Sequence, residues 1–137
     1  MYTRNVKALG VAALLCFLLP AAAFAKDPEG TWTGTFRWEN SAKSVDAEVN
    51  FKDSTVRFQS PYRCTVPIKR AADEGSLTYT FGVSSAGGMF CQGLMDAKFV
   101  LTLGSDGKTA SAEFTTTGTL GRGKWAGKLQ APGSSGR

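Results

Sequence analysis

The stretch GTWTGTFRW, residues 30–38, alternates large apolar or glycine residues with polar ones. Because successive side chains of a strand point to opposite faces, Trp32, Gly34 and Phe36 share one face of an extended strand. The same Trp-x-Gly-x-hydrophobe pattern returns at residues 125–129 in the sequence GKWAGKL. The repeated pattern predicts two half-buried strands of similar shape, one near each end of the folded domain.

Alternation with a period of two residues continues between these two segments. Polar or glycine-rich turns separate the alternating segments, and residues 105–108 (SDGK) carry the Asp-Gly pair favoured in tight hairpins. No stretch is long enough for a helical crossover, so consecutive strands are expected to pair antiparallel. The candidate strands are residues 31–38, 45–51, 55–59, 62–69, 77–83, 89–95, 98–103, 109–114 and 124–129. In the ambiguous segment 89–95, Met89, Cys91 and Met95 are expected to point inward.

One apolar face per strand must be covered, either by a second sheet or by closure of the sheet on itself. Closure also removes the two exposed edges of an open meander. We therefore predict an all-β domain of eight or nine antiparallel strands, closed or nearly closed as a small barrel, with its first and last strands meeting at a seam. The alternative for the repeated Trp and Gly is chance recurrence in a glycine-rich β protein. Pro67 lacks an amide hydrogen and is expected at a sheet edge or a bulge.

The opening residues GTWTG, 30–34, resemble the first strand of lipocalins and of avidin-like proteins. The resemblance implies a calycin-like barrel architecture. Avidin-like pockets also use tryptophans from late strands, whereas the sequence has no tryptophan between Trp38 and Trp125. No binding residue therefore carries over from either family.

The first 25 residues have the features of a cleaved export signal. Arg4 and Lys7 precede an apolar run that is short of the roughly 20 residues of a membrane span. Pro20 then breaks the run, and Ala23 and Ala25 occupy the small-residue positions of a signal-peptidase site. We expect cleavage after Ala25, a periplasmic or secreted protein, and no membrane span.

Cleavage would leave 112 of the 137 residues, with 14 basic and 11 acidic side chains and a net charge of +3. This charge by itself indicates no nucleic-acid role. We expect a single domain at residues 26–130 and a disordered tail at residues 131–137. The remaining Cys64 and Cys91 are expected to form a disulfide in an oxidising compartment. Closing that loop would stabilise the domain by about 3–4 kcal/mol.

The sequence offers little for catalysis. It contains no histidine, which removes the usual general base and the usual partner of a Ser or Cys nucleophile. With both cysteines bonded, no ligand set for zinc remains. Asp46 and Glu48 share the outward face of a strand, where nothing raises the pKa of a general acid. We expect no enzyme activity, no metal and no cofactor.

Aromatic and Met side chains near strand ends, or beside the glycine-rich residues 84–88 (SSAGG), form the first candidate site. They are Trp38, Tyr62, Tyr79, Met89 and Phe90. Around a barrel mouth, such side chains suit a small hydrophobic or aromatic ligand. The alternative is that they belong to the core, because so small a barrel is filled by its own side chains.

Basic side chains form the second candidate site. Arg57, Arg63, Lys69 and Arg70 lie on or near the outward face of two adjacent strands. They suit an acidic partner or anionic polymer, or they form a solvated face balanced by nearby acids. Nucleic acid is not expected, because no outward aromatic residues alternate with these cations. The second hypothesis is an inhibitor of a secreted hydrolase, such as a lysozyme, or an envelope-polymer binder, acting through this face and the glycine-rich loop.

Overall fold

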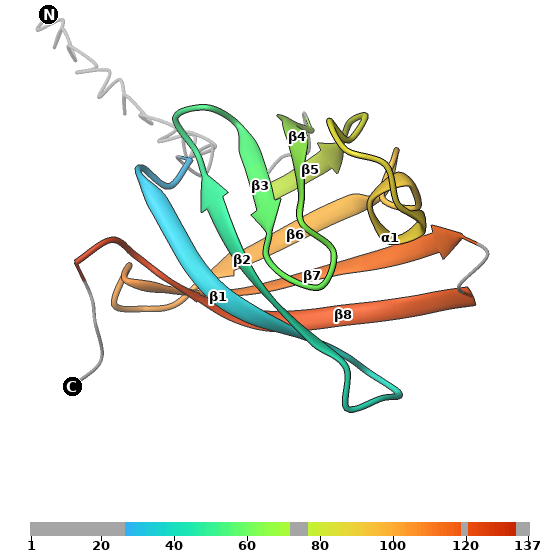
Figure 1. Cartoon of the computed structure of the whole chain (residues 1–137). Coiled ribbons are helices and arrows are strands. Elements are labelled where there is room, and N and C mark those ends of the chain that lie inside the picture. The colour runs from blue at the N-terminus through green and yellow to red at the C-terminus, as the bar shows by residue number, and fades with distance from the viewer. Residues whose placement is uncertain (1–26, 72–76, 119–120, 134–137) are drawn as a thin grey trace, which may run out of the picture.

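The computed structural model of the protein describes residues 27–71, 77–118 and 121–133 (Figure 1). The predicted leader lies outside these residues. The described elements are β1 (Thr31–Trp38), β2 (Ser44–Asn50), β3 (Thr55–Phe58), β4 (Cys64–Arg70), β5 (Leu77–Phe81), α1 (Met89–Gln92), β6 (Lys98–Leu103), β7 (Thr109–Gly118) and β8 (Gly121–Gln130). Each strand pairs antiparallel with the next, and β1 also pairs with β8. The predicted closed antiparallel barrel is confirmed.

The two Trp-x-Gly segments lie side by side at the seam between β1 and β8. Gly34 is opposite Leu129 and Gly127 is opposite Phe36, so the glycine of each motif faces the hydrophobe of the other. A Cβ atom on Gly34 would lie 2.1 Å from a carbonyl oxygen of β8, and one on Gly127 would lie 2.3 Å from a carbonyl oxygen of β1. The two glycines therefore allow close approach of backbone to backbone.

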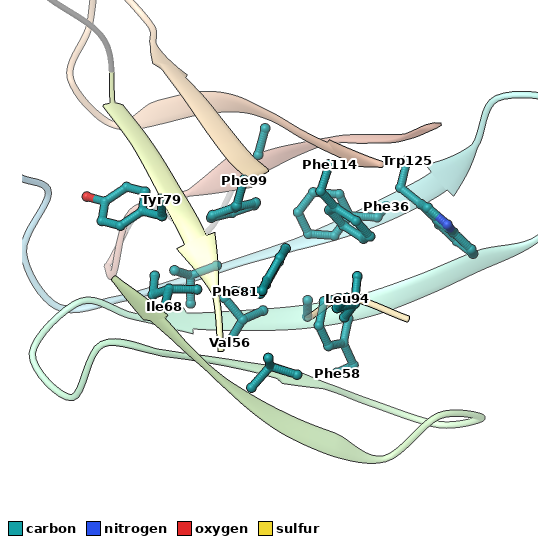
Figure 2. Packing of buried hydrophobic residues seen from close by; sticks show 14 of the residues in the cluster. Phe36, Val56, Phe58, Ile68, Tyr79, Phe81, Leu94, Phe99, Phe114 and Trp125 are labelled. Carbon is teal, nitrogen blue, oxygen red and sulfur yellow. The ribbon is translucent and has the colours of Figure 1, made fainter. Parts of the chain in front are cut away.

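Aromatic side chains fill the middle of the barrel (Figure 2). Phe36, Phe58, Phe81, Phe99 and Phe114 are each at most 2% exposed. Phe114 packs against Phe36 and Phe81 with ring centroids 5.1 and 5.6 Å apart. Burial of each ring stabilises the fold by about 1.5–3 kcal/mol. The middle of the barrel is therefore core, as expected for a barrel of this size.

The segment predicted as the sixth strand forms α1 and a following turn. Met89 and Met95 were expected to point inward, but they are 58% and 51% exposed. The buried side chains are Phe90, Cys91 and Leu94, which recur at the spacing of one helical turn. Seven residues, one of them Gly93, are too few for either period to show clearly, so the sequence pattern is ambiguous here.

Pro67 lies in β4, between β3 and β5, and not at an edge. Pairing changes sides at this residue, since Pro67 is the last partner of β3 and Ile68 is the first partner of β5. The amide of Gly82 donates a 2.7 Å hydrogen bond to the carbonyl oxygen of Pro67. Pro67 thus uses its acceptor on the side where pairing with β5 begins.

The predicted hairpin at residues 105–108 is present between β6 and β7. The Asp106 carboxylate accepts hydrogen bonds from the backbone amides of Lys108 and Thr109, at 2.9 and 3.1 Å. These bonds, that of Lys108 first, lower the pKa of Asp106. The amide of Ala131 donates to the carbonyl oxygen of Lys108 at 2.8 Å. The barrel therefore includes the first residue of the predicted tail, whose last four residues lie outside the described part.

Candidate functional site

One end of the barrel carries a small pocket of about 120 Å³, here called the aromatic pocket. Its walls come from segments far apart in the sequence: the end of β1, the β1–β2 turn, the loop before β4, α1, β7 and β8. The lining side chains are those of Trp38, Lys43, Tyr62, Phe90, Thr116 and Trp125. The meander therefore gathers four aromatic residues at one barrel end.

Two stacked pairs of rings make the walls of the aromatic pocket. Trp38 stacks on Trp125 with centroids 6.0 Å apart and an interplanar angle of 15°. Tyr62 stacks on Phe90 at 3.9 Å and 13°. The two pairs stand almost perpendicular, because Trp125 meets Phe90 at 78° and Tyr62 at 88°. Flat aromatic walls of this kind suit a planar apolar group.

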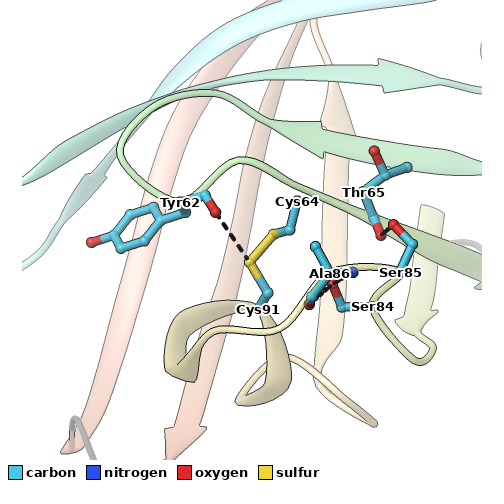
Figure 3. The surroundings of a disulfide bond; sticks show 7 residues. All are labelled: Tyr62, Cys64, Thr65, Ser84, Ser85, Ala86 and Cys91. Atoms are coloured by element: carbon cyan, nitrogen blue, oxygen red, sulfur yellow. Dashed lines mark hydrogen bonds between the residues drawn. A yellow bond between two sulfur atoms is a disulfide. The ribbon is translucent and has the colours of Figure 1, made fainter.

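The disulfide between Cys64 and Cys91 holds one wall of the pocket in place (Figure 3). It joins the start of β4 to α1 across a Cα–Cα distance of 6.3 Å, and the predicted bond is confirmed. Phe90 is the neighbour of Cys91, and Sγ of Cys91 lies 3.9 Å from the carbonyl oxygen of Tyr62. The cross-link therefore anchors both members of the Tyr62–Phe90 stack.

Polar groups at the pocket are mainly hydrogen-bond donors. The Lys43 ammonium lies 5.4 Å from the centroid of the Trp38 ring. The indole N–H of Trp38 is buried and has no hydrogen-bond partner within the described residues. It rests against Gly123, where a Cβ atom would lie 2.0 Å from the indole nitrogen. The buried Thr116 hydroxyl already donates to the carbonyl oxygen of Gly123 at 3.3 Å.

Three of the five residues predicted for the barrel mouth meet in the aromatic pocket, namely Trp38, Tyr62 and Phe90. The other two are elsewhere. Met89 lies on the exposed side of α1. Tyr79 lies toward the opposite end of the barrel, far from Trp125 (Figure 2), where it packs on Phe51 at 5.9 Å. The structure therefore splits the predicted set between two places.

Tyr79 closes the opposite end of the barrel together with Asp27 and Arg70. Its hydroxyl donates a 2.7 Å hydrogen bond to the carboxylate of Asp27, which also pairs with the Arg70 guanidinium. Burial, and then the hydrogen bond to Asp27, raise the pKa of Tyr79 to about 12. Arg70 was predicted on the outward basic face, but its guanidinium lies 5.5 Å from the Tyr79 ring centroid, at the barrel end.

The remaining basic residues are divided between two places on the barrel wall. Arg57 and Arg63 line an open hollow of about 630 Å³, here called the basic hollow, whose far side is Ser85 and Ala86. Lys69 lines a separate, smaller hollow beside β5. Of the four predicted cations, the structure thus brings together only Arg57 and Arg63.

Sequence reasoning missed three residues of the aromatic pocket. Trp125 lies on a strand predicted to be half-buried, but alternation alone does not pair it with Trp38, its partner in the β1–β8 register. Thr116 lies beyond the segment predicted as its strand, and Lys43 lies in the turn predicted between the first two strands. The signal that was available is strand direction, because alternate strands of a meander run toward opposite barrel ends.

The fold and site define the protein as a closed antiparallel β-barrel with an aromatic pocket at one end. Searches against protein-family models, curated proteins and solved structures find no match. Within residues 27–71, 77–118 and 121–133, no group of three cysteine or acidic side chains is placed to hold a metal ion. No helix in the same ranges is long and apolar enough to cross a membrane.

Proposed function

We propose that the protein is a non-catalytic binding protein that holds a small hydrophobic or aromatic group in the aromatic pocket. The observation that carries this proposal is an open space of about 120 Å³ between four aromatic rings, in a barrel whose middle is filled. An apolar cavity of about 150 Å³ is enough to hold one benzene ring. The pocket is somewhat smaller than that cavity and is open to the outside, so it suits no more than a single ring, whose outer atoms extend beyond the pocket.

The size of the pocket limits the affinity of a bare ring. At about 0.5 kcal/mol per non-hydrogen atom, a ligand of about eight atoms binds with about 4 kcal/mol. That free energy corresponds to a Kd of about 1 mM. A natural ligand that binds more tightly must make further contacts at the rim of the pocket.

The proposed compartment is outside the cytosol, either the periplasm or the medium. The Cys64–Cys91 disulfide supports this proposal, because such bonds persist in oxidising compartments. The leader-like first 25 residues support it as well. Native mass spectrometry of protein exported by a bacterial host tests both points. The expected species begins at Lys26, carries the disulfide, and is the form to inspect for a co-purified ligand.

Ligand titration followed by NMR tests the proposed site. Phenol and indole are expected to shift the indole N–H resonances of Trp38 and Trp125. In a Gly123→Ala variant, the new Cβ would lie 2.0 Å from the Trp38 nitrogen, so the ring must move and binding should weaken. Gly87→Ala is the matched control, because no atom lies within 4 Å of its Cβ position. Absence of any shift at ligand concentrations well above a millimolar would refute the proposal.

A second candidate function is action through the surface, on a secreted hydrolase such as a lysozyme or on an envelope polymer. Exposed large apolar side chains favour it: among the described residues, three of four lie between β5 and β6, namely Val83, Met89 and Met95. The basic hollow adjoins this segment through Ser85. Exposed apolar groups beside cations are a common feature of binding surfaces.

Removal of the two cations of the basic hollow tests the second candidate. Arg63 has a φ of +46°, a conformation that favours glycine, so Arg63→Gly removes the charge without strain. Combined with Arg57→Ala, it should weaken inhibition of lysozyme or retention on a peptidoglycan resin. Lys69→Ala, in the neighbouring hollow, is the control. Equal activity of both variants and the native protein would argue against surface action.

A further inference from the structure

The charges around the aromatic pocket bear on what its ligand carries beside the ring. We propose that the ligand is a small aromatic acid, with its ring in the pocket and its carboxylate at Lys43. This inference rests on the proposed function, because it names the ligand class of the same site. It follows from the kinds of polar group that line the pocket and from their partners.

Among the described residues, the pocket lining contains a cation and no carboxylate. Besides the four rings, the described residues that line it are Lys43 and Thr116. The ion pairs seen in the described part of the chain join Arg70 to Asp27 and Lys124 to Glu113, and neither involves Lys43. A cationic ligand would therefore bring a second positive charge to the pocket, whereas an anionic ligand would find an ammonium group there.

The acidic residues on either side of Lys43 along the chain are Glu39 and Asp46, and neither is among the described residues that line the aromatic pocket. Glu39 follows Trp38 directly, and its backbone amide donates to the carbonyl oxygen of Lys124 at 2.9 Å. The negative charge of Glu39 acts on Lys124, whose pKa is raised by Glu113 first and by Glu39 as well. Asp46 accepts a hydrogen bond from the Thr35 hydroxyl, and Lys43 is the charged residue of the β1–β2 turn that lines the pocket.

The reach of the Lys43 side chain fits a carboxylate attached to a bound ring. Its ammonium lies 5.4 Å from the centroid of Trp38, which is itself a wall of the pocket. A ring stacked in the pocket therefore brings a substituent one or two carbons away within contact of the ammonium. The existing contact between Lys43 and the face of Trp38 is weak at an exposed site, and the flexible lysine stem can leave it.

Three probes with the same ring separate charge from ring binding. Phenylacetate, phenylacetamide and phenethylamine are titrated into the exported full chain, and NMR gives the Kd of each. Phenylacetate is expected to bind about tenfold more tightly than phenylacetamide, because a hydrogen bond to a charged group gains that factor. Phenethylamine is expected to bind most weakly. The preference for the acid should shrink as salt is added.

Variants at Lys43 assign the preference to this residue. Lys43→Met keeps an apolar stem and should reduce the affinity for phenylacetate to that for phenylacetamide, while Lys43→Arg should retain it. Lys52→Met, in the turn at the opposite barrel end, changes the net charge equally and should have no effect. Equal binding of acid and amide, or a preference unaffected by Lys43→Met, would overturn the inference while leaving ring binding intact. If no probe binds, the proposed function fails as well.

Discussion

Replacement of Gly127 by alanine should loosen the seam that closes the barrel. The new methyl group would lie 2.3 Å from a carbonyl oxygen of β1 and 3.1 Å from the Cα atom of Phe36. Both neighbours are backbone atoms within paired strands, so neither can turn aside as a side chain would. The two strands must separate locally by several tenths of an ångström or more.

The cost can be worked out from the parts that move. Overpacking in a well-packed interior costs about 1–3 kcal/mol, and about two seam hydrogen bonds weakened next to Gly127 cost about 1 kcal/mol each. Replacing glycine by alanine also stabilises the folded protein by about 0.5–1 kcal/mol, because the unfolded chain loses conformational entropy. The net destabilisation is therefore about 3 kcal/mol. For a domain of this size, that lowers the Tm by roughly 12–18 °C.

Thermal and urea denaturation of Gly127→Ala, Gly87→Ala and the native protein measures this cost. The Cβ position of Gly87 has no atom within 4 Å, so Gly87→Ala should change stability by less than about 0.5 kcal/mol. Gly34→Ala should resemble Gly127→Ala, and the double variant should cost less than the sum, because one separation of the strands relieves both clashes. A Gly127→Ala protein as stable as the control would refute the close approach at the seam.

Two further predictions concern the disulfide and the opposite end of the barrel. Replacing both Cys64 and Cys91 by alanine should lower the free energy of unfolding by about 3–4 kcal/mol, seen as a lower urea midpoint; an unchanged midpoint would mean that packing alone fixes α1. The pKa of Tyr79 is raised to about 12 in the folded protein, against about 10 in the unfolded chain. The stability contributed by its neutral phenol is complete below about pH 10 and is lost as the pH rises toward 12, by about 1–2 kcal/mol after allowance for solvent screening. The free energy of unfolding of the Tyr79→Phe variant should decline less steeply with pH over this range. Equal slopes for the variant and the native protein would contradict the prediction.

The sequence was sufficient to predict the barrel because alternation with a period of two identifies the buried face of each strand. The matching motifs around Gly34 and Gly127 also predicted the seam, and the register pairs them reciprocally. The Cys64–Cys91 bond followed from the number of cysteines and the leader. These features depend on local pattern or on composition, and both can be read from a single chain.

Predicting the aromatic pocket requires information that the alternation of apolar and polar residues does not contain. A period of two tells which face a side chain takes, but not which end of the barrel it approaches. Trp38 ends β1, and Tyr62 precedes β4, so both lie at the same end of a meander. Tyr79 sits within β5 and packs toward the other end. Tracing strand direction would have separated these residues; the position of Phe90 depended on a helical turn that was too short to recognise.

The aromatic pocket and the seam share the same two strands, which links ligand binding to barrel closure. Trp38 of β1 and Trp125 of β8 are partners in the seam register and form the stacked wall of the pocket. A ligand held against both rings binds only the closed seam, and so it must stabilise closure by its own binding free energy. At ten times its Kd, a ligand adds about 1.4 kcal/mol. That is about half of the stability that Gly127→Ala is expected to lose.

Phenylacetate should therefore raise the Tm of Gly127→Ala. It should fail to do so in a Gly127→Ala/Gly123→Ala protein, where the Trp38 ring is displaced. A Tm that rises equally in both would place the ligand away from the seam.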